Sequence, residues 1–297
     1  MNVIESISKL QAQSREWRAQ GRPVALVPTM GALHPGHTSL VRSALHEGAR
    51  VIVSIFVNPL QFGPEEDFSR YPRTFDADVR TIEAAGAHAV FHPGVGEMYP
   101  TGFTTRVSVG DLGHFLEGKA RPGHFDGVVT VVARLLGAAI PDRAYFGQKD
   151  AQQLAVIRRM VRDLAIPVEI VGCPTVREQD GLAMSSRNRY LGTADRALAL
   201  GLVRALAEAQ ALYQDGIRAI PAIEAAMWAV LRAHRLSPDY ATLVDPDTFG
   251  APGPGRPWLA AIAAPVGPAR LIDNAAVEDG NLLGYRQVEH FASGLAV

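Results

Sequence analysis

Short apolar stretches alternate with amphipathic segments through about the first 175 residues of the chain. The apolar stretches are rich in β-branched and aromatic residues, as buried strands are, and cover residues 24–27, 51–57, 87–91, 144–146 and 168–171. The segments between them show helical spacing, at residues 37–48, 75–85, 128–139 and 151–164. Strands that alternate with helices are joined by right-handed crossovers into a parallel sheet. The sequence therefore predicts an α/β fold for this part.

The composition changes past residue 190. An alanine-rich helix is predicted from Thr193, its N-cap, to about Tyr213, and a second over residues 220–234. Strand-like residues 240–244 and 258–262 follow, separated by a turn-rich segment. We predict a Rossmann-like parallel-sheet domain over residues 1–175 and a smaller C-terminal α+β domain over residues 176–297 that closes as a lid. The tail after about residue 280 has little pattern, and we assign it no structure.

The overall balance of charge argues against two classes of partner. The 297 residues carry a formal net charge of -1, which does not suit a protein that wraps nucleic acid or lies on an acidic membrane. The N-terminus lacks the pattern of a signal peptide, and no apolar stretch reaches the roughly 18 residues that span a bilayer. The single cysteine, Cys173, fits a reducing cytoplasm and is expected to be a buried, inert thiol.

The most informative motif follows the first predicted strand. Residues 28–37 read Pro-Thr-Met-Gly-Ala-Leu-His-Pro-Gly-His and lead directly into an amphipathic helix. A strand, a glycine turn and a helix start aim backbone N–H groups and the positive helix end at one spot, which suits an anion. His34 and His37 add two hydrogen-bond donors there. The His-x-x-His spacing also fits zinc, but no further ligand cluster lies nearby, so we favour the phosphates of a nucleoside triphosphate.

Polar residues follow other predicted strands at the same edge of the sheet. Asn58 and Gln61 follow the second strand, and carboxamides suit a neutral or hydroxylated substrate, although a capped turn has the same composition. Lys149 and Asp150 follow a later strand, where lysine suits phosphate and either Asp150 or a backbone group suits ribose hydroxyls. A solvated charged turn is the alternative for that pair. Ligands bind beyond the carboxyl ends of parallel strands, so these loops are expected to converge.

A glycine turn at Gly181 leads into a segment with two hydroxyls and two guanidiniums, Met184-Ser185-Ser186-Arg187-Asn188-Arg189. Hydroxyls and an arginine fork suit triphosphate oxygens, and a loop can fold over them. Taken alone, such a segment is more often a helix-capping turn. A covalent serine nucleophile is not expected, because the Gly-x-Ser-x-Gly setting is missing.

Together these motifs resemble the pantothenate synthetase (pantoate–β-alanine ligase) family of the nucleotidyltransferase superfamily, which carries a His-x-Gly-His signature. The resemblance rests on motifs in family order and spacing at residues 28–40, 54–63, 71–74, 121–127, 146–154 and 175–191, with Leu271-Ile272-Asp273-Asn274 near the end. It implies a two-step ligation in which ATP and pantoate form pantoyl adenylate and pyrophosphate, and β-alanine then displaces AMP to give pantothenate.

The resemblance also implies roles for individual residues. Catalysis would involve His34, His37, Lys149 and Arg187, and Gln61 and Gln153 would bind pantoate hydroxyls with Asn58 close by. The ATP site would comprise Met30, Gly31, Ala32, Leu33, His34, Pro35, Gly36, His37, Gly147, Gln148, Lys149, Asp150, Val176, Met184, Ser185, Ser186 and Arg187. Family members use Mg²⁺, held largely through ATP oxygens, and are typically cytoplasmic homodimers. Asp76 and Asp78 are either outer Mg²⁺ ligands or a charged helix start.

The departures from the family pattern are small. Gln148 stands where the family often has Glu, and Ala151 where it often has an aromatic residue, so an active enzyme is expected. A transferase that moves a nucleotide onto a phosphate acceptor would need a further basic cluster, and a class I tRNA synthetase would need a basic face and an anticodon-binding part. A catalytically dead nucleotide-binding regulator is disfavoured because the expected phosphate-contacting residues are present.

Overall fold

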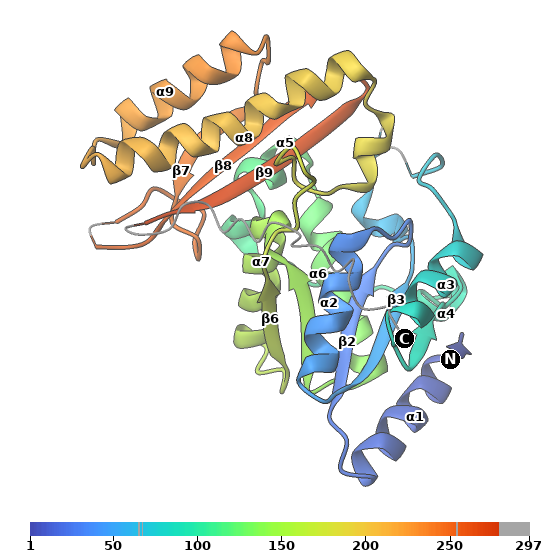
Figure 1. Cartoon of the computed structure of the whole chain (residues 1–297). Coiled ribbons are helices and arrows are strands. Elements are labelled where there is room, and N and C mark those ends of the chain that lie inside the picture. The colour runs from blue at the N-terminus through green and yellow to red at the C-terminus, as the bar shows by residue number, and fades with distance from the viewer. Residues whose placement is uncertain (65, 67, 254, 279–297) are drawn as a thin grey trace, which may run out of the picture. The chain divides into compact units, whose positions relative to one another are not determined.

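Six parallel strands form the sheet of the larger of two compact units in the computed structural model, which describes residues 1–64, 66, 68–253 and 255–278 (Figure 1). This unit takes in Met1–Gln148 and Gln152–Cys173. The strand order is β1-β4-β3-β2-β5-β6. The strands are β1 (Asn2–Ile4), β2 (Val24–Thr29), β3 (Arg50–Ile55), β4 (Ala89–Phe91), β5 (Arg143–Gly147) and β6 (Glu169–Cys173).

Helices cover both faces of this sheet. They are α1 (Ile7–Ala19), α2 (Pro35–His46), α3 (Phe75–Ala84), α4 (Val95–Met98), α5 (Leu116–Ala120), α6 (His124–Ala139) and α7 (Ala151–Asp163). Alternate residues of β2 enter different cores: Leu26 packs in one with α1, α6 and α7, and Val27 packs in the other with α2 and α3. Strands buried on both faces are apolar at nearly every position, which explains why the sequence shows them as almost continuous apolar stretches.

The predicted parallel α/β sheet is confirmed, and the five predicted strands correspond to β2 through β6. Strand β1 and helix α1 were not predicted from the sequence. Strand β1 has three residues, too few for a periodic pattern, and α1 buries only Leu10, Ser14 and Trp17. Its hydrophobic signal is therefore weak, and its local start signal is Ser6, whose side chain accepts a hydrogen bond from the N–H of Lys9 at 3.2 Å.

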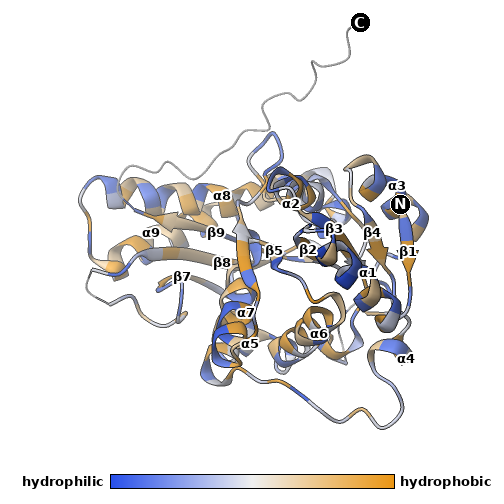
Figure 2. Ribbon diagram, turned by 90° about the horizontal axis from the view of Figure 1, so that it is seen from below, coloured by the Kyte–Doolittle hydropathy of each residue, from blue (hydrophilic) through white to orange (hydrophobic). Residues whose placement is uncertain are grey.

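The smaller unit contains an antiparallel sheet in the order β7-β8-β9, with two helices on it. Its elements are α8 (Thr193–Gln214), α9 (Ile220–Ala233), β7 (Tyr240–Val244), β8 (Trp258–Val266) and β9 (Ala269–Val277). Figure 2 shows hydrophilic and hydrophobic stretches alternating along α8, as expected for a helix with one buried face. The prediction of a smaller α+β domain is confirmed, but Thr193 is the first residue of α8, and Gly192 is its N-cap. Strand β9 was missed.

This unit takes in Lys149–Ala151 and the described residues from Pro174 onward. The predicted division at residue 175 stays a prediction, as does the lid role, and the tail after about residue 280 lies outside the described residues. Cys173 is buried as predicted, and burial raises the pKa of its thiol. Over the described part of the chain, no helix combines the length and apolarity that crossing a membrane requires.

Candidate functional site

The parallel sheet changes its direction of growth between β2 and β5. From β2 the chain adds β3 and β4 on one side, and later adds β5 and β6 on the other. Pairing of β2 with β3 extends to Thr29 and Ile55, whereas pairing of β2 with β5 ends at Leu26 and Ala144. Ligands of open parallel sheets bind beyond the carboxyl ends of the strands at such a switch point. The loop after β2, which holds the predicted histidine motif, lies there.

The loop from β2 to α2 is held in a tight turn. Gly31 has a φ of +84°, and a Cβ atom there would lie 2.9 Å from Asp78 Oδ2. The hydroxyl of Thr29 donates to the Ser54 carbonyl at 2.7 Å and accepts from the Gly31 N–H at 3.2 Å. Pro35 begins α2, a position where its missing N–H costs nothing. The motif's glycine and prolines therefore set the backbone of the loop.

Asp78 anchors the same loop from α3. Its buried carboxylate accepts the N–H groups of Ala32 at 3.0 Å and Leu33 at 2.9 Å, and the hydroxyl of Thr74 at 3.1 Å. These two N–H groups are thus taken by protein, which differs from the expectation that loop N–H groups face an anion. Asp78 serves as a structural anchor, and Asp76 is exposed in the first turn of α3. An anion here would be held by the start of α2 and by the imidazoles.

The two histidines of the motif lie side by side. Their ring centroids are 4.1 Å apart, with the planes inclined at 42°. His37 Nδ1 accepts a hydrogen bond from the N–H of His34 at 3.3 Å. A neutral imidazole that accepts through Nδ1 carries its proton on Nε2, so His37 offers Nε2–H as a donor. The predicted pairing of the two imidazoles at the start of α2 is therefore present.

The carboxamides of Asn58 and Gln61 meet in a buried cluster. A 3₁₀ turn, η1 (Pro59–Gln61), brings Asn58 Nδ2 to 3.0 Å from Gln61 Oε1. Asn58 also donates to the Gly127 carbonyl at 3.1 Å and accepts from the Tyr99 hydroxyl at 2.7 Å. Gln61 Nε2 donates to Met30 Sδ at 3.2 Å, so the loops after β2 and β3 converge as predicted.

The Lys149 segment forms a 3₁₀ turn, η3 (Gln148–Asp150), between β5 and α7. Lys149 Nζ lies 3.7 Å from Asp150 Oδ1, a long ion pair with Asp150 half exposed. The Lys149 carbonyl accepts from Asn274 Nδ2 of β9 at 2.7 Å. Strand β9 thus fixes the backbone of Lys149, while its ammonium is loosely paired. Lys149 and Arg187 belong to the smaller unit, and the two histidines belong to the larger one.

The serine and arginine segment forms another 3₁₀ turn, η4 (Ser186–Tyr190). Ser185 caps it by accepting the N–H of Arg187 at 3.2 Å, which confirms the capping alternative for this serine. Asn188 Nδ2 donates to Glu178 Oε1 at 2.6 Å and to the Ala183 carbonyl at 3.0 Å. The loop is therefore anchored at its base. That it binds phosphate stays a prediction.

A buried ion pair that the sequence analysis missed holds the base of this loop. Arg177 Nη1 and Nη2 donate to the two carboxylate oxygens of Asp273 at 2.6 Å and 2.9 Å. Arg177 also donates to the carbonyls of Gly181 at 3.1 Å and Asn274 at 3.3 Å. The side chains are 7% and 1% exposed. The two residues are 96 positions apart, so no local signal connects them.

Three other predicted site residues, Gly147, Val176 and Gln153, lie near β5, β6 and α7, and their binding roles stay predictions. Gly147 ends β5 opposite Cys173, and the Val176 carbonyl accepts the N–H of Met184 at 2.9 Å. Gln153 lies partly buried in α7 beside Gln152, whose side chain binds the carbonyls of Leu112 and Phe115. Within the described ranges, no group of three or more His, Cys, Asp or Glu could hold a metal ion.

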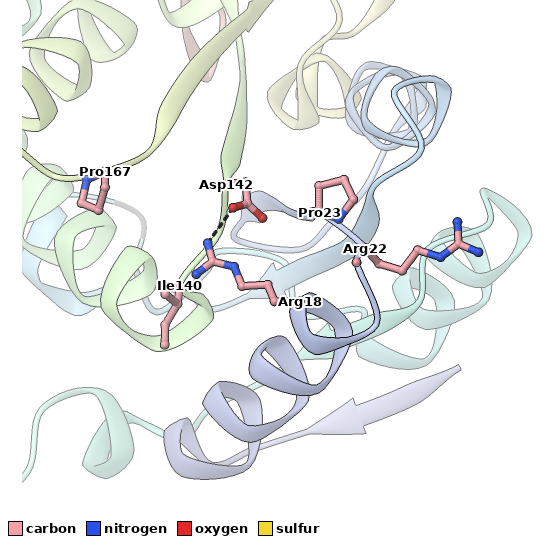
Figure 3. Close-up of a pocket in the computed structure, with 7 residues that line it drawn as sticks. Arg18, Arg22, Pro23, Ile140, Asp142 and Pro167 are labelled. Atoms are coloured by element: carbon pink, nitrogen blue, oxygen red, sulfur yellow. Dashed lines mark hydrogen bonds and ion pairs between the residues drawn. The ribbon is translucent and has the colours of Figure 1, made fainter.

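A surface hollow lies at the opposite, amino-terminal edge of the parallel sheet (Figure 3). Its lining includes Arg18, Arg22, Asp142 and Pro167. Both carboxylate oxygens of Asp142 have partners there, since Oδ1 accepts Arg18 Nη2 at 2.8 Å and Oδ2 accepts the N–H of Val24 at 2.7 Å, and Figure 3 shows Arg22 pointing away from it. This carboxylate joins α1 to the start of β2, so the hollow is a structural feature of the sheet's base.

The sheet, its switch point and the histidine loop define an α/β protein of the doubly wound, Rossmann-like class. A sequence profile of the pantoate–β-alanine ligase family matches residues 2–276. The chain belongs to the pantoate–β-alanine ligase family.

Two relatives and two solved structures illustrate the similarity. The chain is 53% identical to the pantothenate synthetase of Rubrobacter xylanophilus over 93% of its own length and 98% of the relative's. It is 49% identical to the pantothenate synthetase of Caldicellulosiruptor bescii, over 94% of its own length and 99% of the relative's. The crystal structure of the Thermus thermophilus enzyme superposes with a TM-score of 0.87 at 47% identity, over 93% and 99% of the two chains. The crystal structure of the Francisella tularensis ligase, solved with β,γ-ATP and β-alanine, superposes with a TM-score of 0.77 at 33% sequence identity. The match covers 94% of this chain and 99% of that chain.

Proposed function

We propose that this chain ligates pantoate and β-alanine to pantothenate at the expense of ATP. The observation that carries the proposal is the histidine loop at the switch point of a chain that matches the ligase family over residues 2–276. The bound ligands of the Francisella tularensis relative, an ATP analogue and β-alanine, fit the same reaction.

The chemistry requires activation of a carboxylate. In the first step a pantoate carboxylate oxygen attacks the α-phosphorus of ATP, and the bond to pyrophosphate breaks, which gives pantoyl adenylate. In the second step the amine of β-alanine attacks the acyl carbon, the bond to the AMP oxygen breaks, and the amine loses a proton. The first step depends on positioning and charge stabilisation more than on a protein nucleophile.

In the larger unit, His34 and His37 would donate hydrogen bonds to the phosphates of ATP. For His37 the donor is Nε2–H, because its Nδ1 accepts the N–H of His34. The buried carboxamide cluster would bind pantoate, with Gln61 and Gln153 on its hydroxyls and Asn58 holding Gln61. Polar groups of this neutral kind recognise hydroxyls without adding charge beside a carboxylate.

Lys149 of the smaller unit would bind phosphate, and its chain neighbours Gly147, Gln148 and Asp150 would line the ribose and phosphate region with it. Val176 would contact adenine. Met184, Ser185, Ser186 and Arg187 would cover the triphosphate, and lid closure remains part of the proposal. The support is chemical, because an ammonium and a guanidinium are the side chains suited to phosphate oxygens.

Mg²⁺ would be held mainly by phosphate oxygens of the nucleotide, where it would neutralise charge that develops on pyrophosphate. Magnesium commonly binds through substrate phosphates with few protein carboxylates, which fits a loop whose anchoring carboxylate, Asp78, is engaged by backbone N–H groups. The cytoplasmic location and the homodimer are further parts of the proposal and rest on the family resemblance alone.

Pantoate-dependent exchange of labelled pyrophosphate into ATP tests the proposal. Exchange should require pantoate and should not require β-alanine. His37→Ala should lower the exchange rate by about 10²–10³, the usual loss for one transition-state donor. His46→Ala removes an exposed histidine at the other end of the same helix and is the matched control. Exchange without pantoate, or exchange driven by a phosphate acceptor, would reject the ligase assignment, and near-normal exchange in His37→Ala would remove His37 from it.

A further inference from the structure

The carboxamide turn η1 packs closely against the first turn of α6. A Cβ atom on Gly127 would lie 2.2 Å from the Leu60 carbonyl oxygen and 2.6 Å from the Gln61 Cα. No side chain fits at that distance, so α6 and the turn touch through their backbones. The position of Gln61 therefore depends directly on the start of α6, where His124 is the first residue.

His124 holds the main chain of Gln61. Its Nδ1 lies 2.8 Å from the Gln61 carbonyl oxygen, and its Nε2 lies 3.0 Å from Arg121 Nη1. A guanidinium donates only, so Nε2 must accept, and the ring proton must be on Nδ1. Nδ1–H then donates to the Gln61 carbonyl. His124 is buried, with 8% of the residue exposed, so water has little access to these contacts.

An ion pair fixes the other side of this imidazole. Arg121 Nε and Nη2 donate to the two carboxylate oxygens of Glu66 at 2.8 Å and 2.5 Å. Glu66 lies just after the carboxamide turn, and its N–H donates to the Gly63 carbonyl at 3.1 Å. The loop from Gln61 to Glu66 is thus bridged at its two ends by Arg121 and His124, which come from another segment of the chain.

Two contacts of different strength orient the carboxamide of Gln61, one at its oxygen and one at its nitrogen. Its Oε1 accepts from Asn58 Nδ2 at 3.0 Å, and its Nε2 donates to Met30 Sδ at 3.2 Å. A thioether is a weak acceptor, so a substrate hydroxyl would replace it at small cost. The amide donor is therefore oriented and held ready for a hydroxylated ligand, provided that the main chain of Gln61 stays in place.

We propose that His124 is a positioning residue for hydroxy-acid recognition: its Nδ1–H grips the Gln61 carbonyl and so directs the Gln61 carboxamide at a pantoate hydroxyl. This inference rests on the proposed function, in which Gln61 binds pantoate. His124 does not touch the substrate, and the Glu66–Arg121 pair keeps its ring in the required orientation and tautomer.

The electrostatics of the cluster agree with a ring that is neutral near pH 7. Burial and the adjacent Arg121 lower the pKa of His124 to about 4, against smaller opposite effects of the Gln61 carbonyl, Glu66 and Glu117. Protonation would put a second N–H against the guanidinium. The donor toward Gln61 is therefore constant across the pH range in which a biosynthetic enzyme works.

Two substitutions distinguish the contact made by Nδ1 of His124 from the contact made by its Nε2. An asparagine amide reaches about the position of Nδ1, and a glutamine amide reaches about that of Nε2. His124→Asn should keep the contact with Gln61 and leave the pantoate KM within about threefold of the parent value. His124→Gln should lose it and raise the pantoate KM by about tenfold, the upper end for one hydrogen bond, with the ATP KM unchanged. His114→Gln, at an exposed histidine, is the matched control.

Equal pantoate KM values in His124→Asn and His124→Gln would overturn the proposal, as would a parent-like value in His124→Gln. A nitrogen-15 spectrum of the unaltered protein at pH 7 gives a second test that needs no variant to fold. The Nδ1–H tautomer is expected for His124, and an Nε2–H or doubly protonated ring would refute the assignment.

Gln61→Ala, measured in parallel, separates failure of this inference from failure of the proposed function. A raised pantoate KM in Gln61→Ala together with a parent-like His124→Gln would reject only the positioning role. A parent-like pantoate KM in Gln61→Ala would reject the pantoate assignment of Gln61 itself, whatever the His124 variants show.

Discussion

The Arg177–Asp273 pair makes the stability of the smaller unit sensitive to one side-chain oxygen. Asp273→Asn keeps the shape and removes the charge, so the Arg177 guanidinium stays buried opposite an amide N–H group. Both partners are more than nine-tenths buried and share two hydrogen bonds, at 2.6 Å and 2.9 Å. Breaking a pair of this kind by altering one partner costs about 3–5 kcal/mol, because the remaining charge is uncompensated. We expect a loss of about 3 kcal/mol in the free energy of unfolding.

Tryptophan fluorescence can report on this unit alone. The chain has 3 tryptophans, of which Trp228 and Trp258 lie in the smaller unit and Trp17 in the larger. In a Trp17→Phe background, urea unfolding followed by fluorescence should show the loss, and thermal unfolding should show a midpoint lower by roughly 10 °C. Asp247→Asn is the matched control, since its pair with Arg256 is at 2.6 Å with both side chains about half exposed or more, and it should cost less than about 1 kcal/mol.

The double substitution Arg177→Met with Asp273→Leu should recover much of the stability, because it removes both charges together. If Asp273→Asn loses no more than Asp247→Asn does, the reasoning from burial is refuted. If the double variant is as unstable as Asp273→Asn, the loss comes from packing around β9 and the ionic explanation is wrong.

The larger unit gives two further predictions. Gly31→Ala should lower the free energy of unfolding by about 1–3 kcal/mol and raise the ATP KM, because it places a Cβ 2.9 Å from Asp78 Oδ2 at a φ of +84°. The control Gly21→Ala also lies at positive φ but in open space, so its loss of stability should be smaller. Equal losses in the two variants would contradict the role of the Asp78 contact. The pKa of His124 lies near 4, below its value in the unfolded chain, so the stability from the neutral ring is full above pH 6.5 and is lost as the pH falls toward 4. Between pH 6.5 and pH 5 the unaltered protein should lose up to roughly 2 kcal/mol more than His124→Asn does in urea unfolding, and parallel pH profiles would rule this out.

Local sequence determined the elements whose signals are local. The central strands β2, β3 and β4 are mostly apolar because both faces of the sheet are covered, and the helices between the strands show their period directly. The pairing of His34 with His37 was predictable because the turn, the proline and the helix start are all contiguous with them. The meeting of Asn58 and Gln61 with the Met30 loop was predictable from parallel topology alone, since carboxyl ends of parallel strands share an edge.

Tertiary structure decided what depends on distant partners. Sequence left Asp78 open between a metal ligand and a helix start, and only the folded loop shows that it binds the N–H groups of Ala32 and Leu33. Strand β9 escaped prediction because Asp273 interrupts an otherwise apolar alternation, and a buried carboxylate is favourable only where a partner such as Arg177 meets it. Residues close together in the sequence can predict a strand, a turn or a hydrogen-bond donor. The role of a buried charged or titratable side chain depends on the group that contacts it in the folded structure, which can lie far away in the sequence.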